Sequence, residues 1–271
     1  QEKGGLLTAE DLAAHASTWE EPIEVTYRGY RLLECGPNGQ GLVALQALGI
    51  LAGFDLGSMR WGHADALHLQ IEAIKLAFAD AARYLADPAQ VEVPVKGLLN
   101  PGYLAARRGR IDSRHASPGY ASGFPDAHAD TAYLAVVDEE RNAVSFISSL
   151  FHPFGAGLVP PGTGILLQNR GALFSLDPTH PNCIAPGKRP YHTIIPALLL
   201  QGRELCLCFG VMGGFMQPQG QVQVLVNLVD FGMDVQQALD APRFRWDEGN
   251  RVAFEAGLGH MTRLELEKRG H

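Results

Sequence analysis

Residues 129–157 read ADTAYLAVVDEERNAVSFISSLFHPFGAG, and the interpretation of the whole chain depends on this stretch. Apolar and polar residues alternate from Ala132 to Asp138 and again from Ala143 to Leu150, with the period of two that half-buried strands show. The stretch follows residues 109–130, which are rich in Gly, Pro, Ser, His and Asp and show no periodicity. We therefore predict a strand pair that begins abruptly at Thr131 after a linker.

Strands and helices are also predicted on both sides of this pair. We expect a helix after the N-cap Thr8 and a hairpin closed at Arg28-Gly29. Pairs of strands followed by helices indicate an α+β layered fold, and their order is too irregular for a doubly wound nucleotide fold. The predicted strands are 23–27, 30–34, 194–200 and 205–210, and the predicted helices are 42–53, 62–85, 217–231, 235–239 and 262–269.

Composition excludes some classes of partner. With 46% hydrophobic and 19% charged residues in 271, the chain can bury a substantial core. A net charge of -7 argues against a surface for nucleic acid or for anionic membranes. The longest apolar run, near residues 193–200, has the length of a strand, and a membrane helix requires about 18 residues. We predict no nucleic-acid partner and no membrane span.

The chain reads as an interior fragment of a longer protein. It begins with Gln1 and stops at Gly270-His271, where a charged helix would need a C-terminal continuation. We therefore expect truncation at both ends.

Motifs for cofactors and metals are missing. The sequence contains no G-x-x-x-x-G-K-[ST], no G-x-G-x-x-G between a strand and a helix, no G-x-S-x-G and no H-E-x-x-H. His63 and His68 are five residues apart, and His115 and His128 lie in the linker. We predict no cofactor and no metal, and we interpret the histidines as hydrogen-bonded or solvated side chains.

The four cysteines form no Cys-x-x-Cys pair and have no histidines at zinc spacing. We interpret them as buried thiols in a sheet. They are Cys35, Cys183, Cys206 and Cys208.

Thr131 is the candidate nucleophile. A threonine freed by cleavage just before it can use its own α-amine as the base, because that amine has a pKa near ~7.7–8.0. Gly213 and Gly214 lie between a strand and a helix, where adjacent amides can stabilise an oxyanion. Two plainer interpretations remain open, namely a threonine that merely opens a strand and a glycine turn that merely requires positive φ.

Short motifs occur in the order and spacing of the gamma-glutamyltransferase family, which the chain resembles over essentially its whole length. They are Thr131 with VVD at 136–138, NAV at 142–144, FGAG at 154–157, GILLQN at 164–169, GKRP at 187–190, GG at 213–214 and APRF at 241–244. GGLLTAEDLAAH at 4–15 and the hairpin from Pro22 resemble the later part of that family's large subunit.

The resemblance implies an Ntn-hydrolase with an αββα four-layer sandwich, made as one precursor that cuts itself between Asp130 and Thr131. Residues 1–130 would form the C-terminal part of a large subunit, ending in a flexible pre-cleavage tail. Residues 131–271 would form the small catalytic subunit, truncated at its C-terminus.

The resemblance also implies roles for single residues. Thr131 is the nucleophile, and Gly213 and Gly214 supply the oxyanion hole. Ser149 stands where the family has a threonine that hydrogen-bonds the nucleophile's amine, and a serine hydroxyl can do the same. Two further positions correspond to the family's pair of substrate-binding serines, with His192 at the first and Thr193 at the second.

The pocket departs from the family at Phe151, Arg170 and Leu173, where the family has Asn, Gln and Asp. Without the acid at Leu173, an α-ammonium loses its counter-charge, and Arg170 attracts a carboxylate instead. QNRG at 168–171 and MGGFMQPQ at 212–219 resemble the branch with oxamate amidohydrolase and the cephalosporin acylases.

We therefore expect an amidohydrolase or acyltransferase that acts on a small acidic or apolar acyl group, with water or an amine as acceptor. Its expected partners are its own two subunits, with a homodimer of that pair as a further possibility. The alternatives are a true gamma-glutamyltransferase or glutathione hydrolase, and a non-catalytic binding or assembly member of the fold.

Overall fold

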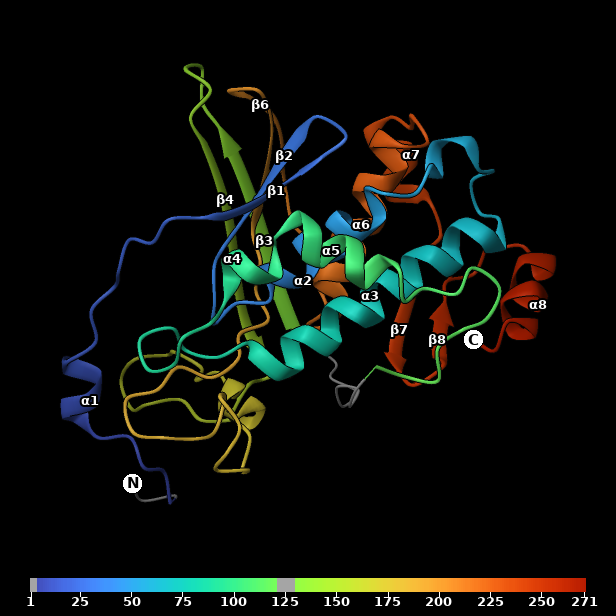
Figure 1. Cartoon of the computed structure of the whole chain (residues 1–271). Helices are drawn as coiled ribbons and strands as arrows, with labels where there is room; N and C mark the ends of the chain where they lie inside the picture. Colours follow the sequence, from blue (N-terminus) through green and yellow to red (C-terminus); the bar gives the residue numbers. More distant parts are fainter. Residues whose placement is uncertain (1–3, 121–129) are drawn as a thin grey trace.

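The computed structural model describes residues 4–120 and 130–271, which form a mixed arrangement of helices and sheets (Figure 1). Its largest sheet is four-stranded and antiparallel, in the order β1-β2-β5-β6. Because β2 pairs directly with β5, residues far before and far after Thr131 share one sheet. The strands are β1 (Ile23–Tyr27), β2 (Tyr30–Glu34), β5 (Ala197–Gln201) and β6 (Glu204–Phe209).

The turn between β1 and β2 explains why this hairpin could be predicted with its correct bounds. Arg28 and Gly29 have φ angles of 51° and 87°. Two successive residues with positive φ give the tight turn whose twist matches that of paired strands. The N-terminal helix α1 (Ala9–Ala13) is confirmed as well, and Thr8 and Asp11 form its capping box.

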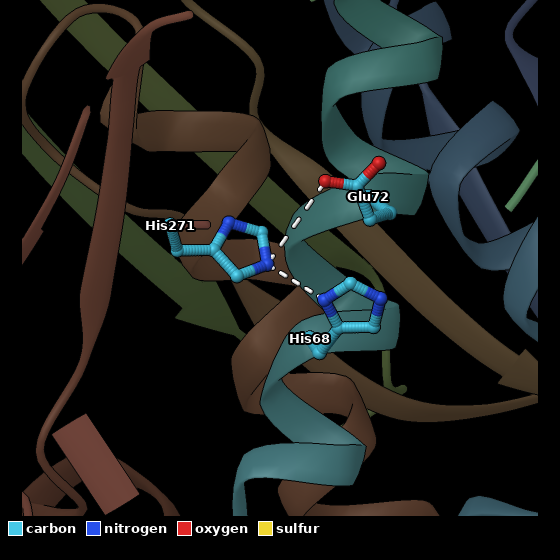
Figure 2. Close-up of side chains that lie close together, drawn as sticks. All are labelled: His68, Glu72 and His271. Carbon is cyan, nitrogen blue, oxygen red and sulfur yellow. Dashed lines mark hydrogen bonds and ion pairs between the residues drawn. The ribbon is translucent and has the colours of Figure 1, made fainter. Parts of the chain in front are cut away.

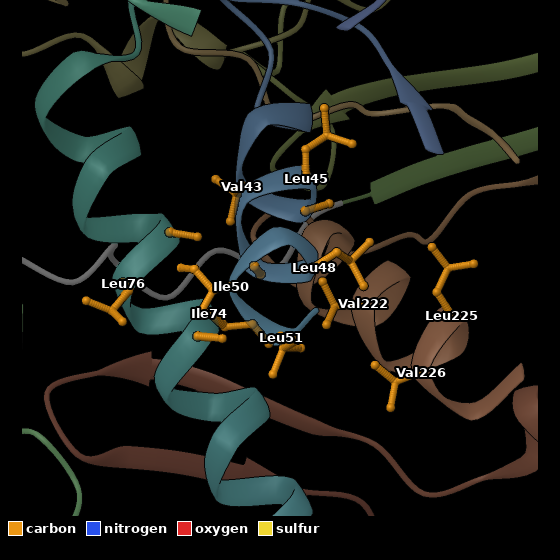
Figure 3. Close-up of a cluster of buried hydrophobic side chains, with 14 of the residues drawn as sticks. Val43, Leu45, Leu48, Ile50, Leu51, Ile74, Leu76, Val222, Leu225 and Val226 are labelled. Carbon is orange, nitrogen blue, oxygen red and sulfur yellow. The ribbon is translucent and has the colours of Figure 1, made fainter. Parts of the chain in front are cut away.

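Helix α2 (Gly41–Leu51) lies at the centre of the hydrophobic core, and every one of its 11 residues is buried. It packs against β1 and three helices, as Figure 3 shows for α3 and α6. A helix that is apolar on all sides must be enclosed in this way. The surrounding helices are α3 (Ala64–Tyr84), α5 (Pro101–Arg108) and α6 (Met216–Val229).

The predicted strand pair forms a separate hairpin of β3 (Asp130–Val137) and β4 (Ala143–Phe151). Its inner side lies against β6, where the Ser145 hydroxyl donates to the Phe209 carbonyl at 3.4 Å. Its other side is an apolar face of four residues, each 50–55% exposed. These residues, named here the hairpin face, are Leu134, Val136, Val144 and Phe146, and they form two cross-strand pairs.

The C-terminal part adds α7 (Val235–Asp240), a hairpin of β7 (Phe244–Glu248) and β8 (Arg251–Phe254), and α8 (His260–Lys268). The helices were predicted, but the hairpin was not, because its strands are short and rich in charge. The short helices α4 (Val95–Leu98) and α5 were also missed. Asn100 caps α5 and Pro101 is its first residue, so this start carried a readable signal.

Part of the predicted linker is not loose. The Ser117 amide and the Tyr120 hydroxyl both donate to Glu72 Oε2 at 3.2 Å, which ties this segment to α3. Residues 121–129 of the predicted tail lie outside the described residues.

The interpretation of the cysteines as buried thiols is wrong. Cys35 and Cys206 are exposed, whereas Cys183 and Cys208 are partly buried, and all four are free. The four-stranded sheet leaves β6 at its edge, so β6 side chains are less enclosed than those of a central strand.

None of the helices within residues 4–120 and 130–271 combines the length and apolar character that crossing a bilayer requires.

Candidate active site

Thr131 lies near the start of β3, directly opposite Ser149 on β4. The register of the pair shifts between Asp130 and Thr131, so the regular ladder begins only after this peptide bond. The Thr131 Oγ1 atom is buried and has no hydrogen-bond partner among the described residues. A buried hydroxyl without a hydrogen-bond partner is unusual in a folded protein.

Ser149 shapes the end of β4 in the continuous chain. Its hydroxyl accepts a hydrogen bond from the Phe151 amide at 3.0 Å. Phe151 is 1% exposed and has a φ of 77°, a conformation that bulky residues rarely adopt. Its ring stacks on that of His152 with centroids 4.3 Å apart. Strained residues of this kind persist only where their surroundings hold them, as this contact and this stack do.

Arg170 is buried beside these residues, with an exposed fraction of 2%. Its Nε donates to the Thr193 hydroxyl at 3.3 Å, its Nη2 donates to the Ser149 carbonyl at 3.4 Å, and its guanidinium lies 5.7 Å from the Phe151 ring centroid. Burial lowers the pKa of Arg170 to about 10. None of the carboxylates whose side chains the structure describes forms an ion pair with it. Among the described side chains, Arg170 is therefore a buried cation without a counter-charge.

Thr193 contacts Arg170, and His192 precedes Thr193 in the sequence. Thr193 is fully buried, and its hydroxyl is the one that meets Arg170. Burial, followed by the charge of Arg170, lowers the pKa of His192 to about 3. His192 is thus neutral near pH 7, and its Nδ1 accepts from the Ile194 amide at 3.3 Å. It adds no second positive charge to the site.

Leu173 ends the short 3₁₀ helix Arg170–Leu173 and packs against the hydrophobic core. Its carbonyl accepts from the Asn182 side chain at 2.8 Å. Of the three residues predicted to alter the substrate pocket, Arg170 and Leu173 thus lie in one 3₁₀ helix, and Phe151 contacts Arg170.

Gly213 and Gly214 form the turn that leads into α6, with φ angles of 114° and 58°. Their carbonyls accept from Met216 N at 3.0 Å and Gln217 N at 3.2 Å. Among the described residues, neither glycine amide donates a hydrogen bond. The turn thus needs the positive φ angles that glycine adopts readily. It also leaves two backbone N–H groups without an acceptor among the described residues. The Phe215 ring, next in sequence, lies 6.5 Å from that of Phe151.

Gln40 joins the two halves of this arrangement, and no motif or pattern in the sequence indicated this role. Its side-chain amide donates to the Thr193 carbonyl at 2.6 Å and to the Gly214 carbonyl at 2.8 Å. The loop around it was noted only for its glycines. Together these contacts bring Ser149, Arg170, Thr193 and Gly214 into one network next to Thr131.

A second polar cluster was also missed, because its members are far apart in sequence. Figure 2 shows His68 and Glu72, one turn apart on α3, facing His271. His68 Nδ1 lies 2.7 Å from His271 Nε2, and its Nε2 lies 2.7 Å from the Asp112 carbonyl. All three residues could ligate a metal. However, the Lys75 ammonium already donates to Glu72 Oε1 at 2.8 Å and would repel a dication.

Comparison with known proteins identifies the family of the chain. The family model for gamma-glutamyltranspeptidase matches residues 1–271. The chain belongs to the gamma-glutamyltranspeptidase family. The family membership expected from the motifs is thereby confirmed.

Relatives in the family differ in their named activities. The chain is 38% identical to the glutathione hydrolase-like YwrD proenzyme of Bacillus subtilis, covering 100% of this chain and 52% of that protein. It is 38% identical to the oxamate amidohydrolase proenzyme of Klebsiella pneumoniae, covering 99% and 51%. The crystal structure of cephalosporin acylase from Bacillus halodurans matches with a TM-score of 0.91 and 48% identity, covering 100% and 49%. The chain thus spans about half the length of these gamma-glutamyltranspeptidase-family relatives.

Proposed function

We propose that the full-length protein is a self-processing amidohydrolase or acyltransferase whose nucleophile is Thr131. The observation that carries this proposal is the buried, unpartnered Thr131 hydroxyl directly after the register shift at Asp130. Cleavage between these two residues would leave residues 1–130 in a large subunit and start a small subunit at Thr131. The relatives named as proenzymes support such a precursor.

The proposed reaction uses the new α-amine of Thr131 as its base. The amine takes the hydroxyl proton while Oγ1 attacks the amide carbonyl, and the Gly213 and Gly214 amides stabilise the oxyanion. Collapse of the intermediate breaks the amide C–N bond, leaves an acyl ester on Thr131 and releases the leaving amine, which receives the proton held by the Thr131 α-amine. Water or another amine then attacks the ester, the ester C–O bond breaks, and the acid or a new amide leaves while the Thr131 hydroxyl is restored. The Ser149 hydroxyl, opposite Thr131, would hold the α-amine in place.

For the acyl group, we propose a small acid without an α-ammonium. A buried guanidinium without an acidic partner is costly, and a substrate carboxylate would supply the missing charge in bidentate form. Arg170 is such a guanidinium as far as the described side chains show, and Leu173 offers no acid for an ammonium group. A neutral apolar acyl group would fit the Phe151 side of the pocket but would leave Arg170 unpaired.

Glutathione hydrolysis remains the second candidate, because the YwrD relative carries a glutathione hydrolase-like name. Its substrate has a γ-glutamyl group, which carries both a carboxylate and an ammonium. Three p-nitroanilides separate the candidates: γ-glutamyl, glutaryl, which lacks the ammonium, and pentanoyl, which also lacks the carboxylate. We expect the glutaryl compound to react fastest, and faster turnover of the γ-glutamyl compound would favour the second candidate.

The proposed architecture of the complete protein is the αββα four-layer sandwich. The hairpin face supports it, because an apolar sheet surface half open to water normally packs against another layer. The two subunits would stay together after cleavage, since β2 and β5 pair across the cut and share one core.

Intact-mass measurement of the full-length protein tests the proposal. We expect two chains, the second of which starts with Thr131. A single uncut chain that hydrolyses none of the three anilides would instead favour a non-catalytic binding or assembly member.

A further inference from the structure

Gln40 lies in a buried loop that runs alongside the segment carrying His192 and Thr193. Gly39 forms a parallel bridge with His192, and the backbone nitrogen of Gln40 donates to the His192 carbonyl at 3.0 Å. The side chain of Gln40 is fully buried and stands at the N-terminus of α2. Its backbone is therefore fixed relative to Thr193 before the side chain makes any contact.

The Gln40 side chain uses both of its N–H donors and one acceptor position of its oxygen in one orientation. Nε2 donates to the Thr193 carbonyl at 2.6 Å and to the Gly214 carbonyl at 2.8 Å. Oε1 accepts from the Tyr191 hydroxyl at 3.2 Å. Only the amide nitrogen can donate to two carbonyls, so chemistry determines which way this amide points. Gln40 therefore connects Thr193 to Gly214 rigidly.

The hydrogen bond from Gln40 to the Gly214 carbonyl helps to determine how the Gly213-Gly214 turn is oriented. The Gly213 carbonyl accepts from Met216 N, and in a trans peptide the next N–H points the opposite way. The Gly214 N–H therefore points away from α6. Glycine tolerates many backbone conformations, so the direction of the Gly214 carbonyl depends on its hydrogen-bond partners. Its partners are the Gln40 side chain and Gln217 N.

We propose that Gln40 is a positioning residue that holds the Gly213-Gly214 amides at a fixed place relative to the acyl-binding pair of Thr193 and Arg170. This inference rests on the proposed function, because it assigns those amides to the oxyanion. Gln40 touches neither the substrate nor Thr131 in this role. It acts through the Gly214 carbonyl on one side and the Thr193 carbonyl on the other.

The test is Gln40→Met in the full-length protein, which keeps the length and removes both donors. Small displacements of oxyanion donors cost up to about 100-fold in rate, so we expect kcat to fall about 10- to 100-fold, with KM within about threefold. The fall should be equal on glutaryl and pentanoyl p-nitroanilide, because the oxyanion is common to both. A defect in acyl binding would instead raise KM for the glutaryl compound alone.

Gln46→Met is the matched control. Gln46 is also fully buried, lies on α2 and donates two hydrogen bonds, to Asp80 and to the Leu98 carbonyl, away from Thr193 and Gly214. We expect its kcat to stay within about threefold of wild type at a comparable loss of thermal stability. Equal kcat values for the two variants would overturn the role of Gln40.

Tyr191→Phe keeps the proposal testable if Gln40→Met does not fold. It removes the hydroxyl that donates to the Gln40 side-chain oxygen and so loosens the hold on this side chain, and we expect a fall in kcat of about two- to tenfold with KM unchanged. An unchanged kcat in this variant would also count against the proposal. If wild type neither cuts itself nor hydrolyses any anilide, the proposed function fails. If wild type is active and both tests give wild-type kcat, only the role of Gln40 fails.

Discussion

Thr131 on β3 lies opposite Ser149 on β4, and the pairing slips by one residue at the preceding peptide bond. Asp130 is paired with Phe151, so Leu150 has no partner in the ladder. The Ser149 hydroxyl accepts a hydrogen bond from the Phe151 backbone amide. The proposed nucleophile and the proposed cleavage site therefore coincide with the irregular end of an otherwise regular hairpin.

Replacement of Thr131 tests self-cleavage directly. We expect Thr131→Ala in the full-length protein to remain one chain and to hydrolyse no amide, because alanine has no hydroxyl. Thr131→Ser should still be cut, since serine retains the attacking oxygen. Intact mass and N-terminal sequencing measure both results. Normal two-chain processing of the alanine variant would refute the assignment of Thr131.

Ser149 and its neighbour Ser148 form a natural pair for comparison. Ser148 is exposed and lies opposite Ala132, whereas the hydroxyl of Ser149 is within the network of the site. Loss of one hydrogen bond to a charged group costs about 1.5–3 kcal/mol, so Ser149→Ala should lower kcat/KM by roughly 10- to 100-fold. Ser148→Ala should leave it unchanged, and Ser149→Thr should restore most activity. Similar rates for the two alanine variants would contradict the proposed role.

Arg170→Met tests the charge of the acyl group. We expect kcat/KM for glutaryl p-nitroanilide to fall roughly 10- to 100-fold, because a charge-assisted pair is lost, while the pentanoyl compound is unaffected. Thermal stability should not fall, since the substitution removes a buried cation that has no counter-charge among the side chains that the structure describes. Arg203→Met, an exposed site in the turn between β5 and β6, is the control. Equal losses on both anilides would exclude a carboxylate at Arg170.

Three of the hairpins and the long helices could be predicted from the sequence because their signals are local, whereas the short, charge-rich hairpin of β7 and β8 could not. Alternation defined β3 and β4 to within a residue or two, and the glycine turn defined β1 and β2. The network of Gln40 could not be predicted in this way, since its partners are 151 to 174 residues away along the chain. The same reason concealed the contact between His68 and His271. Local patterns say nothing of which distant carbonyl a buried amide will meet.

The position of Arg170 shows what motif correspondence adds and where it stops. The family pattern indicated that this residue faces the substrate, and its charge indicated an acid. Its burial and its lack of an acidic partner among the described residues come only from the three-dimensional structure. These two properties, together with the replacement of the family's glutamine by Arg170, are the reason for proposing a substrate with a carboxylate.

His192 should make the protein less stable in acid. Its pKa is about 3 when folded and near 6.5 when unfolded, so below pH 6.5 the unfolded chain binds a proton that the folded chain does not. Stability therefore falls as the pH decreases from 6.5 toward 3, by at most about 2 kcal/mol between pH 7 and pH 5. His192→Asn keeps an acceptor for Ile194 and should reduce this loss in urea unfolding. His15→Asn, at an exposed position, should not.

Leu173→Asp should shift the substrate preference toward γ-glutamyl compounds. Residues three apart in a 3₁₀ helix lie one above the other, so an aspartate at this position would stand next to Arg170. The pair would then offer a cation to the substrate carboxylate and an anion to its ammonium. We expect the ratio of kcat/KM for γ-glutamyl over glutaryl p-nitroanilide to rise at least about tenfold. Leu176→Asp is the control, because Leu176 is 85% exposed and lies beyond the helix. If the ratio does not change while both variants fold and cut themselves, Leu173 does not face the ammonium position, and Arg170 alone must account for the preference.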